Sequence, residues 1–215
     1  IDKQLDKETK NQRQEARQTE TTMNYAELQV TSNFSFLRGA SHPEEMIEQA
    51  AEYGHTAIAV TDRNSLAGIV RAHAAARGKD IRFIPGCRFD LLDGPSLLAY
   101  PTNQSAYSNI TAILTLGNLR AEKGECHLYR EDIYKNAAGI IFIAIAPALL
   151  TPDFNFPTDF TDALKEYKEA LGSSLYLGAS FSYQGDDHKK LFRLFQLSEK
   201  FEIPMVATND VHYHT

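Results

Sequence analysis

The residues best suited to chemistry are the acid and the imidazole in the segment 207–213. Asp210 and His212 are two positions apart, so in extended backbone both side chains point the same way. A carboxylate and an imidazole placed in this way can share a metal ion. The same spacing suits an Asp–His hydrogen bond that only fixes a loop. Spacing alone leaves both interpretations open.

The elements that must position this pair are short β-rich runs alternating with helical runs. Seven runs predict strands: 26–30, 56–60, 81–84, 96–100, 140–145, 175–179 and 205–208. Apolar periodicity predicts helices over 43–53, 64–77, 106–116, 159–171 and 191–201. Repeated strand–helix units predict a parallel α/β sheet closed by right-handed crossovers. Functional residues of such folds lie beyond the strand ends, here 31–39, 61–68 and 209–215.

The domain is expected to occupy 23–215. Residues 1–22 carry five basic and five acidic side chains and no aromatic residue. They cannot bury enough apolar area to offset their ordering entropy, so we expect a disordered or loosely helical extension there. The remaining chain is short of the roughly 250 residues of a full eight-fold barrel. A smaller, distorted barrel or an open doubly wound sheet fits its length better.

The overall composition excludes several classes of protein. The formal net charge is −6, from 22 basic and 28 acidic residues, which disfavours binding nucleic acid or an anionic membrane by bulk charge. No apolar run approaches the roughly 18 to 20 residues of a membrane span. Cys87 and Cys126 form no paired framework and read as buried small hydrophobes. We therefore expect a cytoplasmic protein with no membrane partner.

Six segments carry a resemblance to a known family. Segments 31–40, 59–68 and 207–213 resemble the successive motifs of the PHP (polymerase and histidinol phosphatase) domain that begins bacterial C-family DNA polymerases. Segments 28–31, 114–117 and 123–128 are similar to the error-prone, translesion members of that family. The resemblance runs in order from about residue 24 to residue 214. It implies a distorted (βα)7 barrel of the PHP type, in agreement with the seven predicted strands.

The resemblance also implies a metal site, from which this sequence departs. Active PHP domains hold up to three metal ions with His, Asp, Glu and Cys side chains at strand ends. Asp62 matches its motif, and Asp210 and His212 remain at ligand positions. The other ligand positions are substituted: the opening H-x-H pair falls on Gln29 and Thr31, an acid on Arg38, a histidine on Arg63, a glutamate on Arg88, and a later histidine on Ser96.

These substitutions argue against metal binding. Gln and Thr are weak ligands, and arginine does not lose its proton at working pH. Three guanidinium groups on one rim would repel a divalent cation, so we expect Arg38, Arg63 and Arg88 to pair with Asp62 and Asp210. Two remaining ligands cannot complete the four-coordinate shell of zinc. An alternative is that the arginines bind an anion such as phosphate.

The resemblance implies the N-terminal PHP domain of an error-prone DNA polymerase, whose separate palm domain uses Mg²⁺. We expect this domain to be structural, without a cofactor, and its partners to be the other polymerase domains, DNA through the full-length protein, and other translesion factors. One alternative is an active phosphoesterase or 3′–5′ exonuclease that holds zinc or manganese. The other is a docking module that uses Phe154, Phe156 and Phe160.

Overall fold

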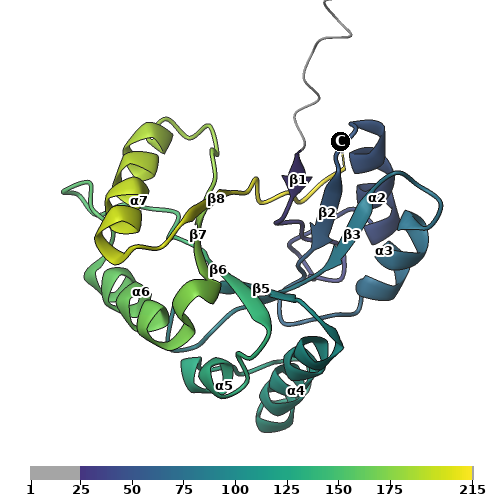
Figure 1. Ribbon diagram of the computed structural model, residues 1–215, viewed down its shortest axis with the longest axis horizontal. Coiled ribbons are helices and arrows are strands. Elements are labelled where there is room, and N and C mark those ends of the chain that lie inside the picture. The colour runs from purple at the N-terminus through teal and green to yellow at the C-terminus, as the bar shows by residue number, and fades with distance from the viewer. Residues whose placement is uncertain (1–24, 215) are drawn as a thin grey trace, which may run out of the picture.

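The computed structural model describes residues 25–214, in which strands and helices alternate along most of the chain (Figure 1). The strands are β1 (Ala26–Glu27), β2 (Ala57–Val60), β3 (Arg82–Pro85), β4 (Cys87–Phe89), β5 (Leu97–Pro101), β6 (Ile140–Ala144), β7 (Leu175–Ala179) and β8 (Met205–Ala207). The helices are α2 (Pro43–Glu52), α3 (Ile69–Ala76), α4 (Gln104–Arg120), α5 (Arg130–Lys135), α6 (Thr158–Leu171), α7 (Asp187–Phe201) and the short 3-10 helix η1 (Gly172–Ser174). The predicted extension 1–22 and the boundary at Met23 lie outside the described residues.

The strands close into a ring with the helices outside it (Figure 1). Three strands pair in the order β1-β2-β3 and five in the order β4-β5-β6-β7-β8. A bridge between Arg63 and Arg88 joins the continuation of β2 to β4, and a bridge between Val30 and Val211 joins the continuations of β1 and β8. Only Gly86 separates β3 from β4, so these two act as one bent strand. The result is the distorted seven-stranded barrel that the sequence predicts.

One strand departs from the predicted parallel arrangement. β1, β2 and β3 are parallel, as are β6, β7 and β8, but β5 runs antiparallel to both β4 and β6. The connection from β4 to β5 is a turn that contains Gly94 and Pro95. A connection this short reverses the chain and cannot make the crossover that a parallel neighbour needs. The prediction of a wholly parallel sheet was therefore wrong at β5.

The predicted strands agree with the structure to within a few residues, whereas one helix begins late and two elements were not predicted. Helix α3 starts at Ile69, and Asn64 itself cannot belong to a helix because its backbone is left-handed (φ 47°). β4 was not distinguished from β3, and α5 has only six residues. No helix within residues 25–214 combines the length and the apolar character that crossing a bilayer would require.

Alternate residues of the strands build two separate parts of the core. On β5, Leu97 and Ala99 pack outward against the helices, in a cluster with Phe142 and Tyr167. Leu98 and Tyr100 point to the other side and pack with the smaller cluster inside the barrel. This is the two-residue alternation expected of a strand buried on both faces. A third cluster lies between β2 and the helices α2 and α3.

Gly86 is where the bent strand passes closest to the barrel interior. A Cβ atom at this position would lie 2.8 Å from the Thr61 Cγ2 methyl and 3.1 Å from the Tyr100 ring. We predict that Gly86→Ala lowers the free energy of unfolding by about 1 to 3 kcal/mol, because a well-packed core must shift to accept the methyl group. Urea denaturation measures the change. Ala74→Ser, which adds one atom on the exposed face of α3, is the control and should change it by less than about 0.5 kcal/mol.

Candidate functional site

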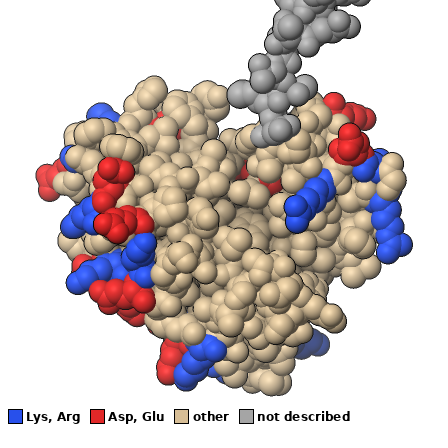
Figure 2. Space-filling model, in the orientation of Figure 1, with Lys and Arg blue, Asp and Glu red and all other residues tan. Residues whose placement is uncertain are grey.

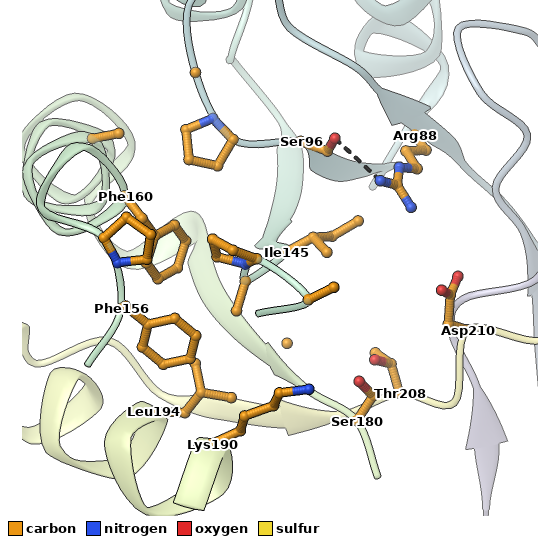
Figure 3. Close-up of a pocket in the computed structure, with 18 of the residues that line it drawn as sticks. Arg88, Ser96, Ile145, Phe156, Phe160, Ser180, Lys190, Leu194, Thr208 and Asp210 are labelled. Atoms are coloured by element: carbon orange, nitrogen blue, oxygen red, sulfur yellow. Dashed lines mark hydrogen bonds between the residues drawn. The ribbon is translucent and has the colours of Figure 1, made fainter. Parts of the chain in front are cut away.

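A cavity of about 1130 Å³ lies where the barrel strands end (Figure 3). One wall is apolar and includes Phe156, Phe160 and Leu194 (Figure 3). Helices and loops supply part of the polar lining, and the strand ends supply the rest: Gln29 after β1, Arg63 after β2, Arg88 on β4, Ser96 before the antiparallel β5, Ser180 after β7, and Thr208 and Asp210 after β8. The lining brings together five of the positions considered for the metal site: Gln29, Arg63, Arg88, Ser96 and Asp210.

Asp90 connects two of the arginines. Its Oδ1 atom lies 2.8 Å from Arg88 Nε, and its Oδ2 atom lies 2.8 Å from Arg63 Nη1. Ser96 Oγ donates to Asp90 Oδ1 at 2.6 Å and accepts from Arg88 Nη2 at 3.3 Å. Asn64 Oδ1 accepts the backbone N–H of Asp90 at 2.9 Å. Each oxygen of the Asp90 carboxylate thus contacts one guanidinium group. The backbone of Asp90 is held in place by its hydrogen bond to Asn64.

The surroundings of Asp90 keep its carboxylate ionised. Burial by itself would raise the pKa of Asp90. The hydrogen bond from Ser96 and the positive charges of Arg88 and Arg63 outweigh burial, and the pKa is lowered below its ordinary value. An ionised acid between two arginines leaves a net positive charge on the group of three.

Asp62 is fully buried and is held by the loop that follows β1. Its Oδ1 atom accepts from the Ser32 backbone N–H at 2.9 Å and from Ser35 Oγ at 2.7 Å. Its Oδ2 atom accepts from Ser32 Oγ at 2.7 Å. Ser35 Oγ also accepts the backbone N–H of Arg63 at 3.0 Å. The expected pairing of Asp62 with an arginine was therefore wrong, because serine and backbone donors occupy both of its oxygens.

Asp210 and His212 lie together, with Gln29 as a third member of the group. Gln29 Nε2 donates to Asp210 Oδ1 at 2.7 Å. His212 Nε2 lies 3.4 Å from the same oxygen, and this buried nitrogen makes no hydrogen bond within the described part of the chain. The expected pairing of Asp210 with an arginine was also wrong. The amide of Gln29, at a position where the family resemblance implies histidine, supplies the donor instead.

The arginines do not all converge. Arg63 and Arg88 meet at Asp90, but Arg38 is exposed and has no ion pair among residues 25–214. Thr31 is buried, and its backbone N–H donates to Val211 O at 2.8 Å. This hydrogen bond helps to join the two ends of the barrel. Sequence reasoning missed Asp90. The signal was present, since residues two apart on a strand point the same way and Arg88 precedes Asp90 by two.

Comparison with known proteins identifies the family. Residues 27–178 match the family model described as the PHP domain. The chain belongs to the PHP family. The error-prone DNA polymerase of Caulobacter vibrioides is 47% identical to this PHP domain over 191 residues, and error-prone DNA polymerase 2 of Agrobacterium fabrum is 44% identical over 192 residues.

The PHP domain spans only 17% of the length of either relative, while the matches cover 88% and 89% of the chain. A solved structure from Bifidobacterium adolescentis, assigned as a metal-dependent phosphoesterase, has a TM-score of 0.65 with 14% identity, and the match covers 88% of both chains. Identity this low supports the shared barrel fold and nothing about the reaction.

The side chains at the strand ends of this PHP domain do not fit the metal site that the family implies. Within residues 25–214, no three His, Cys, Asp or Glu side chains gather closely enough to hold a metal ion. One oxygen of Asp210 already accepts a hydrogen bond from Gln29. Arg63 and Arg88, which cannot lose their protons, add fixed positive charge to the same cavity. The lining also contains acids, but within the described residues no three potential ligands gather, so a divalent cation would find too few ligands there.

The two cysteines and the three phenylalanines considered in the sequence lie in surroundings that favour a structural role. Cys87 is fully buried and Cys126 half-buried, and burial raises the pKa of both thiols, so neither is an activated nucleophile. Phe156 and Phe160 are buried in the core, and only Phe154 is exposed, with Lys189 Nζ 3.8 Å from its ring centroid. The docking surface predicted around these three rings is therefore wrong.

Removing the charge of Asp90 tests the ion-pair network. We predict that Asp90→Asn lowers the free energy of unfolding by about 1 to 3 kcal/mol, because Arg63 and Arg88 then face each other without a counter-charge. Asp210→Asn is the matched control. Its side-chain oxygen still accepts from Gln29, so the expected loss is less than about 1 kcal/mol. Urea denaturation of both variants measures the difference, and an equal effect would contradict this account of the rim.

The lowered pKa of Asp90 also predicts a pH dependence. An acid whose pKa is lower in the folded protein stabilises the fold above its unfolded pKa, and this stabilisation is lost as the pH falls through the folded pKa. The difference in unfolding free energy between wild type and Asp90→Asn should be constant down to about pH 5 and should shrink below about pH 4, near the unfolded pKa of aspartate. Urea denaturation of both proteins at several pH values from about 6 down to about 3 measures it. A constant difference at pH 3 would mean that the carboxylate charge is not responsible.

Proposed function

We propose that this PHP domain is the N-terminal structural domain of an error-prone DNA polymerase, and that it does not itself hydrolyse phosphate esters. The parent protein would carry out DNA-directed nucleotidyl transfer in damage-induced synthesis, with Mg²⁺ held by carboxylates of a separate domain. The observation that supports this proposal best is the position of Asp90 between Arg63 and Arg88. The similarity to error-prone polymerases, of which this chain spans 17%, supports the assignment of the parent.

A metal-dependent phosphoesterase needs a cation where this rim has guanidinium groups. The metal ion of such an enzyme lowers the pKa of a bound water molecule and stabilises negative charge on the phosphoryl oxygens. Arg63 and Arg88 could attract a phosphate, but they cannot generate hydroxide at neutral pH. Among residues 25–214, the Nε2 atom of His212 makes no hydrogen bond that would orient the ring as a base. The side chains therefore favour a structural role.

The ion pairs have a position that suits that role. Arg63 and Arg88 are the two residues of the bridge that joins the continuation of β2 to β4. The backbone N–H of Arg88 donates to Asp62 O at 3.0 Å, and that of Asn64 donates to Arg88 O at 2.8 Å. Asp90 neutralises charge directly beside these backbone hydrogen bonds. In this proposal, the former metal site holds together the place where the barrel closes.

The proposal assigns DNA binding to the rest of the polymerase. The chain carries a net charge of −6. On the face shown in Figure 2, lysine and arginine lie beside aspartate and glutamate, mostly around the edge, without an extended patch of one sign. Proteins that hold DNA by its backbone present clustered positive charge. The partners we propose are therefore the other domains of the same chain, with DNA reached through the full-length cytoplasmic protein and its translesion partners.

Metal content and hydrolysis test the proposal. We predict that the protein, equilibrated with zinc or manganese and then desalted, retains less than about 0.1 equivalent of metal per chain. Hydrolysis of bis(p-nitrophenyl) phosphate should not exceed the rate of the variant Asp210→Ala/His212→Ala. Mass spectrometry of the metals and absorbance at the nitrophenolate band are the measurements. One equivalent of metal, with hydrolysis that this variant loses, would overturn the proposal.

A restored ligand set provides the positive control. The variant Gln29→His/Thr31→His/Arg63→His/Arg88→Glu puts back the side chains that the family resemblance implies at these positions. We expect it to retain metal that the wild type does not, because imidazole and carboxylate ligands replace fixed positive charge. Circular dichroism identifies variants that fail to fold, and the wild-type metal measurement stands without this control.

A further inference from the structure

The loop between β1 and α2 presents two adjacent apolar side chains to solvent. Phe36 is 84% exposed and Leu37 is 85% exposed. Leu37 also has a left-handed backbone (φ 58°), which is unfavourable for a branched side chain. Strained backbone of this kind persists where the surrounding structure fixes it, often where a partner binds. We call Phe36 and Leu37 the apolar tip.

Hydrogen bonds to Asp62 and within the loop itself fix the conformation of this loop. Ser32 and Ser35 anchor it to the buried carboxylate of Asp62. The backbone N–H groups of Arg38 and Gly39 donate to Ser35 O at 3.0 and 3.2 Å. A Cβ atom on Gly39 would lie 2.3 Å from Ser32 O, so only glycine allows the chain to fold back this closely. The apolar tip is therefore presented by an ordered loop.

A neighbouring aromatic residue of the same loop makes more contacts with the domain. Phe34 is 37% exposed, and Arg71 Cζ lies 6.0 Å from the centroid of its ring. Its ring also lies close to Gly68, where an added Cβ would come within 3.2 Å. The loop thus has contacts available for an aromatic side chain, yet Phe36 and Leu37 have none of comparable extent. Single exposed apolar residues are ordinary, but an adjacent pair on a strained and fixed backbone is not.

The last described residues lie against the same loop. The backbone N–H of Ala40 donates to His212 O at 3.3 Å. Ser41 Oγ lies 2.7 Å from His214 Nδ1 and accepts the backbone N–H of His214 at 3.0 Å. In Figure 1 the C-terminal end accordingly lies beside α2, the helix that follows the loop. Residues that follow His214 in a longer chain would leave the barrel beside residues 40 and 41, at the end of the loop that carries the apolar tip.

We propose that the apolar tip docks into an apolar pocket on the part of the polymerase chain that follows this PHP domain. The inference rests on the proposed function, since it requires the longer parent chain, of which relatives contain about 83% beyond this domain. The occupant is chosen by proximity, because the following residues begin at the end of the same loop. DNA suits the tip less well: Phe36 could stack on a base, but Leu37 cannot, and Arg38 is the only charged residue within the loop 33–40.

Hydroxyl-radical footprinting of the full-length polymerase tests this docking. Leu119 on α4 is the matched reference, since it is 81% exposed and has the same side chain as Leu37. We expect Leu37 to be oxidised at least about fivefold more slowly than Leu119 in the absence of DNA, because a docked side chain is shielded from solvent. Equal rates would overturn the proposal and leave the proposed function intact, because that depends on metal content and hydrolysis.

Three further outcomes would assign the tip to another occupant and so overturn the proposal. Protection that disappears on dilution indicates a second copy of the chain. Protection that requires added primer–template indicates DNA. Protection that is lost when residues 1–22 are deleted indicates that segment. Protection that survives all three changes supports docking on the following part of the chain.

A pair of variants gives a second measurement. Phe36→Ser/Leu37→Asn removes the apolar surface and places asparagine where the left-handed backbone tolerates it best. In the full-length polymerase, we expect limited proteolysis just after this domain to become at least about threefold faster, because the docked contact no longer restrains the junction. Leu119→Asn should leave the rate unchanged. An unchanged rate in the tip variant, or an equal increase in both variants, would count against docking.

Discussion

The interaction on which this structure most depends is the contact of one carboxylate with two guanidinium groups where the barrel closes. Arg63 and Arg88 sit on paired backbone, so their positive charges are brought together by the fold itself. Asp90 accepts one hydrogen bond from each guanidinium group, and its negative charge offsets the repulsion between the two positive charges. In a metal-binding PHP domain, a cation gathers acids at the strand ends. Here the signs are reversed, since one carboxylate lies between two guanidinium groups, which stand at positions where the family resemblance implies metal ligands.

The same replacement extends to the acids that remain. Asp62 matches a motif of the family, and here its oxygens order the loop 32–35 through Ser32 and Ser35. Asp210 accepts from Gln29, so it links the strand end after β8 to the one after β1. Each acid now holds neighbouring segments in place by hydrogen bonds. The backbone arrangement therefore persists although the side chains that would bind metal have changed.

Much of this could be predicted from the sequence, and the exceptions have physical causes. Strand positions were predictable because buried β-rich runs are separated by turns and amphipathic helices. The direction of β5 was not, because no residue in a strand records its direction, and only the short Gly94–Pro95 turn reveals it. The family pattern located the rim but directed attention to its own ligand positions. Asp90 lies outside that pattern, so the acid that pairs with the arginines was missed.

Ion pairs at the strand ends and a bound metal ion stabilise a fold under different conditions. A metal site stabilises a fold only after the ion has been taken up, so stability depends on the supply of metal and on ligand protonation. The contacts of Asp90 form with the chain itself and need only that the carboxylate is ionised, which its lowered pKa ensures at neutral pH. A domain with this property can complete its barrel without waiting for a metal ion. Under the proposed function, this independence from metal supply suits a domain whose role is structural.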